Sequence, residues 1–247
     1  ARLSGAKMAG AVLRGALLSE ADLSYADLSG GDLGHALLEQ TNLSRANLTG
    51  ADLDGCALGS TALDGATLER ASLVGCRLDG ARLRGLNLRE ADLSGASLPN
   101  AVLSECDGAM LKLVGAHLAS ASFLKSKLRA ADFSQASMAK ADLRGADLFG
   151  AHFLGAQAAE ARFELAICER ALFIEADLRG ATFVSARLRY AVLDHARVEM
   201  ADFTSCDLTQ ARLHMAKVDG ARWDDAITTL AEHTDADRAI AEAYRPR

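Results

Sequence analysis

The chain has 247 residues, of which half are apolar and 24% are charged, and its formal net charge is −6. This composition excludes a largely disordered chain, and the acidic balance argues against direct binding to nucleic acid. No apolar run is long enough for a transmembrane helix or a secretory signal, so the sequence predicts a cytoplasmic protein that makes no membrane contact.

A five-residue pattern runs from Ala1 to Ala221 without a change of phase. Every fifth residue is small except Leu86 and Leu111, and Ala occupies 35 of the 45 such positions. The residue two further along is large and apolar, with Leu at 30 of 45 positions and Phe at seven. A helix repeats every 3.6 residues and a strand every two, so neither explains a period of five. A fixed period of this kind indicates a solenoid.

Each repeat is expected to be a very short strand with two inward residues, followed by a corner. Four repeats would close a square coil, and coils stacked about 4.8 Å apart would pair their backbones with the coils above and below. The sequence therefore predicts an all-β domain over residues 1–225, with about eleven coils in a rod roughly 50 to 55 Å long.

The N-terminal end is acidic and uncovered. Residues 15–66 contain eight Asp or Glu side chains on the outside of the coils and a single base, Arg45. Asp32 and Asp52 are expected to stack as an unfavourable like-charge pair, with Asp54 beside them, unless a partner or an ion offsets the repulsion. The repeat already runs at Ala1, and solenoids need a cap at each end, so we expect another domain or a partner to cover the first coil.

Further along the chain, four aliphatic residues are expected to project outward from one flat side of the rod. They are Leu154, Leu172, Ile174 and Val192, and Phe149 lies on the adjacent side. A contiguous exposed apolar cluster predicts contact with a protein partner.

No constellation of residues predicts catalysis. The six histidines are scattered, and the nearest group to a site is His195 and His214 with Asp194. Two imidazoles and a carboxylate could hold a metal ion, but an outward face without an enclosing pocket favours solvated side chains. The sequence therefore predicts no enzyme, no metal and no cofactor.

All five cysteines fall at inward positions. We expect buried, reduced thiols, which fit a cytoplasmic protein. Cys56 and Cys76 would be stacked neighbours, so a bridge between them stays open at this point.

The pattern dissolves after Trp223. Apolar residues then recur at helical spacing, and Thr234 with Asp237 matches a capping box. The apolar residues are Ile227, Leu230, Ile240 and Tyr244. The sequence predicts a short α-helical cap over residues 226–247, with these four side chains as cap or dimer contacts.

Many repeats resemble the A(D/N)LxG signature of pentapeptide repeat proteins. Examples are Ala46-Asn47-Leu48-Thr49-Gly50, Ala51-Asp52-Leu53-Asp54-Gly55, Ala91-Asp92-Leu93-Ser94-Gly95 and Ala141-Asp142-Leu143-Arg144-Gly145. The resemblance implies a right-handed quadrilateral parallel β-helix. It also implies homodimerisation through the C-terminal helices.

Two functions of different classes follow. The first is a non-enzymatic, rod-shaped scaffold for protein–protein interaction, as a module of a larger bacterial protein; long leucine-rich arrays also resemble modules of type VI secretion accessory proteins. The alternative is a DNA mimic that binds DNA gyrase and protects against fluoroquinolones. Against the alternative, the acidic residues are concentrated near the N-terminal end.

Overall fold

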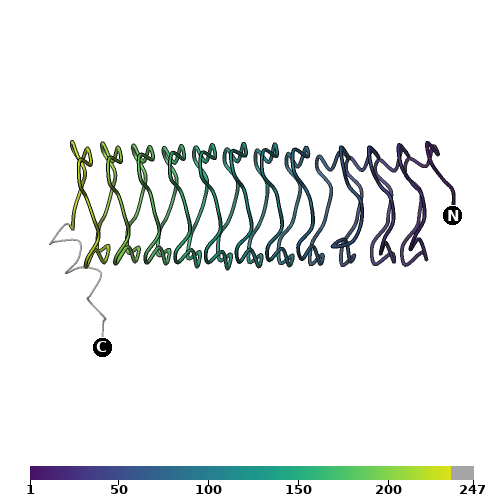
Figure 1. Cartoon of the computed structure of the whole chain (residues 1–247), viewed down its shortest axis with the longest axis horizontal. Helices are drawn as coiled ribbons and strands as arrows, with labels where there is room; N and C mark the ends of the chain where they lie inside the picture. The colour runs from purple at the N-terminus through teal and green to yellow at the C-terminus, as the bar shows by residue number, and fades with distance from the viewer. Residues whose placement is uncertain (235–247) are drawn as a thin grey trace, which may run out of the picture.

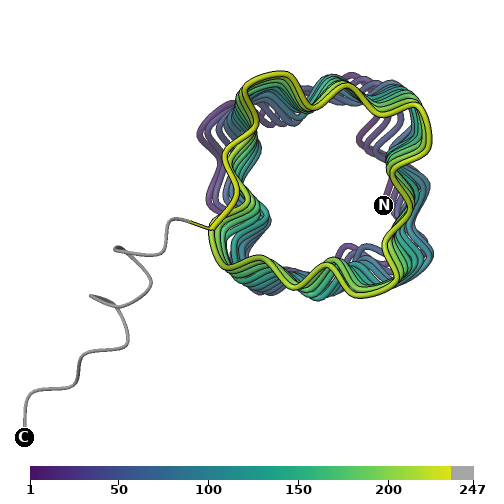
Figure 2. The same ribbon diagram turned by 90° about the vertical axis from the view of Figure 1, so that its left-hand side faces the viewer.

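The computed structural model describes residues 1–234, which form a rod of stacked coils. Figure 1 shows the coils following one another along the long axis, and Figure 2, viewed along that axis, shows their square outline. The predicted square coil of four five-residue sides is confirmed, with bridges between residues 20 apart. We call the four sides face A, face B, face C and face D; they begin with residues 1–5, 6–10, 11–15 and 16–20, and each recurs every 20 residues.

The backbone ladder runs through the second residue of each repeat. Asp22, for example, forms a parallel bridge with Asn42 in the next coil. Leu23 N–H donates to Asn42 O at 2.8 Å, and Asn42 N–H donates to Ala21 O at 2.9 Å. Each strand is a single bridged residue, and residues 1–234 contain neither a longer strand nor a helix. No helix that could cross a bilayer is found among them.

The geometry of the corners explains why polar residues recur at the second position of the repeat. Ala26 N–H donates to Leu23 O at 3.1 Å and closes a turn. The fifth residue takes a positive φ, between 53° and 70° along the chain, which is the conformation that a type II turn requires at its third residue. Asp22 Oδ1 accepts from Ser24 N–H at 3.1 Å. The carboxylate or amide at the second position thus fixes the corner, which is why Asp and Asn recur there.

The core of the C-terminal half is built from two stacked aromatic columns. On face A, ring centroids in successive coils lie 4.4 to 5.0 Å apart, and on face C they lie 4.7 to 4.9 Å apart. The two columns meet edge to face, as at Phe163 and Phe173, 5.8 Å apart at 90°. Ala158 and Cys168, the small residues on the other two faces, are fully buried beside them. Core volume is thereby kept near constant.

One corner departs from the pattern. Leu58-Gly59-Ser60 reverses the Ser-Gly order of common corners such as Ser94-Gly95. Ser60 is the one fifth-position residue between residues 5 and 230 that does not have a positive φ. Its Oγ accepts from Gln40 N–H at 3.2 Å, in place of a backbone carbonyl.

The ladder is interrupted on both sides of this corner. Repeat 56–60 bridges to repeat 76–80, but no bridge joins it to the preceding coil on face D. Repeat 61–65 bridges to repeat 41–45, but no bridge joins it to repeat 81–85 on face A. The ladder is therefore broken before the corner on face D and after it on face A.

The predicted helix is wrong for the first part of the C-terminal region. Ile227 bridges to Asp207 and Glu232 bridges to Arg212, so the coil continues past residue 225 to the end of the described residues. Residues 235–247, which include Ile240 and Tyr244, lie outside the described residues.

Candidate functional site

Apolar side chains gather on face C in the C-terminal half. Leu172 bridges to Val192, and Leu154 and Ile174 occupy the same position in successive repeats, where Gly155 N–H donates to Ile174 O at 2.9 Å. Leu154 is 44% exposed, and the other three aliphatic side chains are half-buried. The structure places the four predicted residues together, and we call them the apolar patch.

Phe149 lies on face B, close to the corner that leads to face C, and it is half-buried. The guanidinium carbon of Arg129 lies 4.4 Å from its ring centroid. Arg170 lies 5.9 Å from the same ring and 5.7 Å from the ring of Tyr190. Arginine stacking therefore covers part of Phe149, so this residue adds a cation–π ladder beside the apolar patch rather than open apolar surface.

The acidic patch contains a base that the sequence analysis missed. Asp32 and Asp52 do stack as a bridge pair. Arg14 Nε lies 2.9 Å from Asp32 Oδ2, and Arg14 Nη2 lies 2.5 Å from Asp52 Oδ2. The hydrogen bond from Arg14 lowers the pKa of Asp32 below its usual range. Asp54 accepts from Val74 N–H at 2.9 Å. The like-charge repulsion is thus offset from within the chain.

Other carboxylates at the N-terminal end have no basic partner among the described residues. They are Glu20, Asp22, Asp27, Glu39 and Asp64. Hydrogen bonds from Ser24 lower the pKa of Asp22, and hydrogen bonds from Ser29 lower that of Asp27. This end therefore stays negatively charged at neutral pH.

Ion pairs in the C-terminal half form both between successive coils, as at Arg129–Asp147 and Arg187–Glu169, and within one repeat. Arg144 pairs with Asp142 of its own repeat, 2.7 Å apart. Asp142 also forms a backbone bridge with Arg162, whose side chain pairs with Glu164. Further pairs within one repeat are Arg162–Glu164, Arg179–Asp177 and Arg197–Glu199.

The structure brings His195, His214 and Asp194 together, but the carboxylate of Asp194 already has partners within the chain. The rings of His195 and His214 lie 5.6 Å apart at 84°. Asp194 forms an ion pair with Arg212 and accepts from His214 N–H at 3.3 Å. Residues 1–234 contain no group of three His, Cys, Asp or Glu side chains arranged to hold a metal ion.

All five cysteines are free and buried. Burial raises the pKa of Cys56 to about 11 and that of Cys76 to about 12. Their thiols donate to Leu33 O and Leu53 O, at 3.2 and 3.0 Å. A neutral buried thiol is a poor nucleophile, so these residues act as packing groups.

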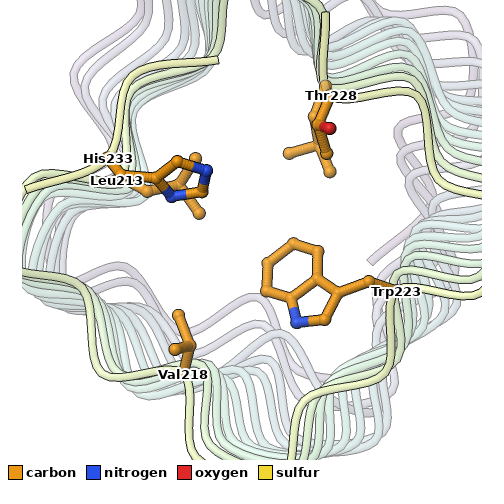
Figure 3. Close-up of a pocket in the computed structure, with 6 residues that line it drawn as sticks. Leu213, Val218, Trp223, Thr228 and His233 are labelled. Atoms are coloured by element: carbon orange, nitrogen blue, oxygen red, sulfur yellow. The ribbon is translucent and has the colours of Figure 1, made fainter.

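The last coil leaves a cavity of about 210 Å³ at the end of the described rod. Figure 3 shows Trp223, Val218, Thr228 and His233 pointing into it from the four sides. Ile227 and Leu230, predicted as cap or dimer contacts, project from the side of the coil and are 51% and 72% exposed.

The comparisons identify the family. The family profile described as pentapeptide repeats matches eight stretches, at residues 1–34, 32–61, 51–87, 61–98, 87–123, 126–164, 166–204 and 186–222. The chain therefore belongs to the pentapeptide repeat family. Proteins of this family are generally structural or interaction proteins rather than enzymes.

Three solved structures illustrate the relationship. HetL, a pentapeptide repeat protein involved in heterocyst differentiation regulation in the cyanobacterium Nostoc sp. strain PCC 7120, is 33% identical, with 93% of this chain and 88% of HetL covered and a TM-score of 0.33. Full-length QnrB1, a plasmid-mediated fluoroquinolone resistance protein, is 18% identical over 87% and 94% of the two chains, with a TM-score of 0.32. A pentapeptide repeat protein from the Arabidopsis thaliana thylakoid lumen is 21% identical over 52% and 69%, with a TM-score of 0.27. A comparison with curated proteins found no significant match.

Proposed function

We propose that the chain is a non-enzymatic rod that binds a protein partner through the apolar patch. The observation that carries this proposal is the contiguity of Leu154, Leu172, Ile174 and Val192 on one flat face. Elsewhere on face C, the exposed aliphatic residues Val12, Val74 and Val114 stand singly, and single exposed residues need no partner.

The arginine–aromatic ladder beside the patch supports the same proposal. Arg and Tyr are enriched at the energetic centres of protein interfaces, and Tyr190 is 44% exposed next to Arg170. A partner that covers the apolar patch and reaches the corner would bury Phe149, Arg170 and Tyr190 together. Rigid backbone ladders on all four sides would hold this surface in one shape.

We also propose where the rod acts and what it is attached to. We place the rod in the cytoplasm of a bacterium, as a module of a larger protein, and the type VI secretion role follows from the resemblance of its leucine-rich array. Five reduced, buried cysteines support a reducing compartment. The partner at the first coil and the C-terminal homodimer belong to the same proposal.

The test compares two double variants of the full chain. Leu154→Asp with Ile174→Asp places two charges in the apolar patch, and Val74→Asp with Val114→Asp places two charges at the same repeat position of the same face. Both variants should unfold in urea like the parent. Immobilised parent and control should retain the same partner from a lysate of the source organism, and the patch variant should lose it. Equal retention by all three proteins would reject the patch as the contact surface.

A second candidate is the gyrase-binding DNA mimic, which the unpaired carboxylates at the N-terminal end favour. An array of negative charge is what such a mimic presents, and Glu20, Asp22 and Asp27 have no ion-pair partner in the described chain. A DNA gyrase supercoiling assay with and without fluoroquinolone tests it. Protection of supercoiling that is lost on replacing these three residues by Asn or Gln would favour the mimic, and no effect of the parent would reject it.

A further inference from the structure

Asp64 and Arg82 form a pair of opposite charges that the structure holds apart. Asp64 is the fourth residue of its repeat on face A, and Arg82 is the second residue of the next repeat on the same face. Both residues are exposed. Among residues 1–234, no hydrogen bond or ion pair joins either side chain to another residue.

The same spacing produces ion pairs elsewhere in the described rod. The fourth residue of one coil lies 18 positions before the second residue of the next, and Glu169 pairs with Arg187 in this way. Asp194 and Arg212 do the same. Four further pairs at this spacing are Arg14–Asp32, Arg89–Asp107, Arg129–Asp147 and Arg189–Asp207. Within residues 1–234, Asp64 and Arg82 are the one oppositely charged pair at this spacing in which both side chains lack an ion partner.

A break in the backbone ladder keeps these two side chains apart. Ala62 and Arg82 do not form a bridge. Leu63 N–H does not donate to Arg82 O, and Arg82 N–H does not donate to Thr61 O, although the corresponding groups pair in regular coils. A polar cavity of about 250 Å³ lies at the break, with Asp64 on one rim and Arg82 on the other. Backbone groups left unpaired in a folded chain are satisfied by water or by a ligand.

The neighbouring contacts limit what the cavity can hold. The coils are still bridged on both adjacent faces, at Ala57–Arg77 and at Thr67–Asn87, so the opening is confined to one repeat. Leu63 is buried, so the core closes the inner side of the cavity. A ligand must therefore be small, and its charged groups must stay toward the outside, where the two charged side chains lie.

We propose that this cavity binds a small zwitterion, of the size of a free amino acid, with its carboxylate on Arg82 and its ammonium group on Asp64. A ligand with only negative charge would be repelled by Asp64, and one with only positive charge would be repelled by Arg82. A molecule with both charges complements both rims. The guanidinium of Arg82 can donate two hydrogen bonds to the carboxylate, and the unused carbonyl of Thr61 can accept one from the ammonium group.

Glycine, β-alanine and γ-aminobutyrate are the probes, because they carry the two charges at increasing separation. We expect at least one of them to shift the amide signals of Leu63 and Arg82 in ¹H–¹⁵N NMR spectra of the full chain, saturably and with little change elsewhere. N-Acetylation of that probe removes its ammonium charge, and amidation removes its carboxylate charge. Each modified probe should bind about three- to tenfold more weakly.

Protein variants separate the site from general charge effects. Asp64→Asn and Arg82→Gln should each weaken binding of the same probe about three- to tenfold. The charge-swapped double variant, Asp64→Arg with Arg82→Asp, should recover affinity because the zwitterion can then bind in the reverse direction. Arg187→Gln, in a pair of the same spacing that is already closed, should leave binding unchanged.

Repair of the irregular corner gives an independent check. The double variant Gly59→Ser with Ser60→Gly restores the common corner order. It should close the ladder, let Asp64 pair with Arg82 and abolish binding, while the spectrum of the C-terminal half stays unchanged.

Three results would overturn the proposal. The first is the absence of a saturable shift with any of the three probes, which would leave a cavity that holds water only. The second is equal binding of the acetylated or the amidated probe, and the third is unchanged binding after the corner has been repaired. None of these outcomes depends on the apolar patch, so they leave the proposed function of the rod untouched.

Discussion

The two halves of the rod share one backbone ladder but differ in what fills it and what covers it. The N-terminal half has a leucine core, unpaired carboxylates and the interrupted corner at Ser60. The C-terminal half has stacked phenylalanine rings, a network of ion pairs and the apolar patch. Because the ladder fixes the inward and outward positions, core and surface can change independently along the chain. Stability and recognition are therefore distributed to different parts of the same fold.

The largest expected effect is the loss of one ring from the aromatic column. Phe163→Ala removes a ring stacked at 4.6 Å on Phe183 and should destabilise the C-terminal half by about 3 to 5 kcal/mol. The measurement is urea unfolding followed by fluorescence of Trp223, the single tryptophan, which stacks at 4.4 Å on Phe203. Phe163→Leu, which restores the residue typical of the N-terminal half, should cost less. A Phe163→Leu variant as stable as the parent would show that the stacking contributes nothing beyond filling the core.

A second variant tests the difference between the two cores by adding volume to the aromatic one. Ala158→Leu introduces leucine at the position of face D that Leu58 occupies in the N-terminal half. In the coil around residue 158, however, Phe153 and Phe163 already fill the core. We expect a destabilisation of about 1 to 3 kcal/mol by urea unfolding. A variant as stable as the parent would contradict the volume compensation between faces.

Repair of the irregular corner should make the N-terminal half more like the C-terminal half. In the present conformation, a Cβ on residue 59 would lie 3.0 Å from Asp79 O, so Gly59→Ser forces the corner to move. Combined with Ser60→Gly, it should restore ladder bonds and stabilise the fold by about 1 kcal/mol. Urea unfolding measures the change, and Ser94→Gly with Gly95→Ser, the opposite swap at a regular corner, should destabilise. An unchanged stability in both variants would show that corner order has no effect.

The smallest expected effect concerns Arg14. The carboxylate of Asp32 has a lowered pKa, so its contribution is present above the unfolded pKa and is lost as pH falls through the folded pKa. Arg14→Gln should therefore be less stable than the parent at pH 7, with the difference vanishing in acid and shrinking in high salt. Thermal unfolding across pH measures it, and NMR should show the pKa of Asp32 rising. Arg222→Gln, at the other end, should leave that pKa unchanged.

The fold was predictable from the sequence because side-chain size alone marks the inward positions. A small residue and an apolar residue recur in one phase, and only a coil with sides of five residues keeps both inside. The square outline did not follow from the period alone, and it was expected from the resemblance to pentapeptide repeat proteins. The apolar patch was predictable too, since residues 20 apart stack and Leu172 could be placed beneath Val192.

Three features could not be predicted, each for a physical reason. Arg14 acts across 38 residues of sequence on Asp52, through the length and flexibility of its side chain rather than through the repeat. The coil beyond residue 225 was hidden because Thr228 and His233 stand at positions that hold leucine in most repeats. The interrupted ladder at Ser60 depends on a two-residue reversal that leaves the five-residue phase intact.

The central claim is that the apolar patch is the partner-binding surface, and site-specific photo-crosslinking tests it most directly. A benzoylphenylalanine side chain is introduced in place of Ile174 in one protein and in place of Val74 in another, at the same repeat position of the same face, and both are irradiated in the source organism. The account predicts one discrete crosslinked species from position 174 and none from position 74. Equal crosslinking from both positions, or none from position 174, would contradict it.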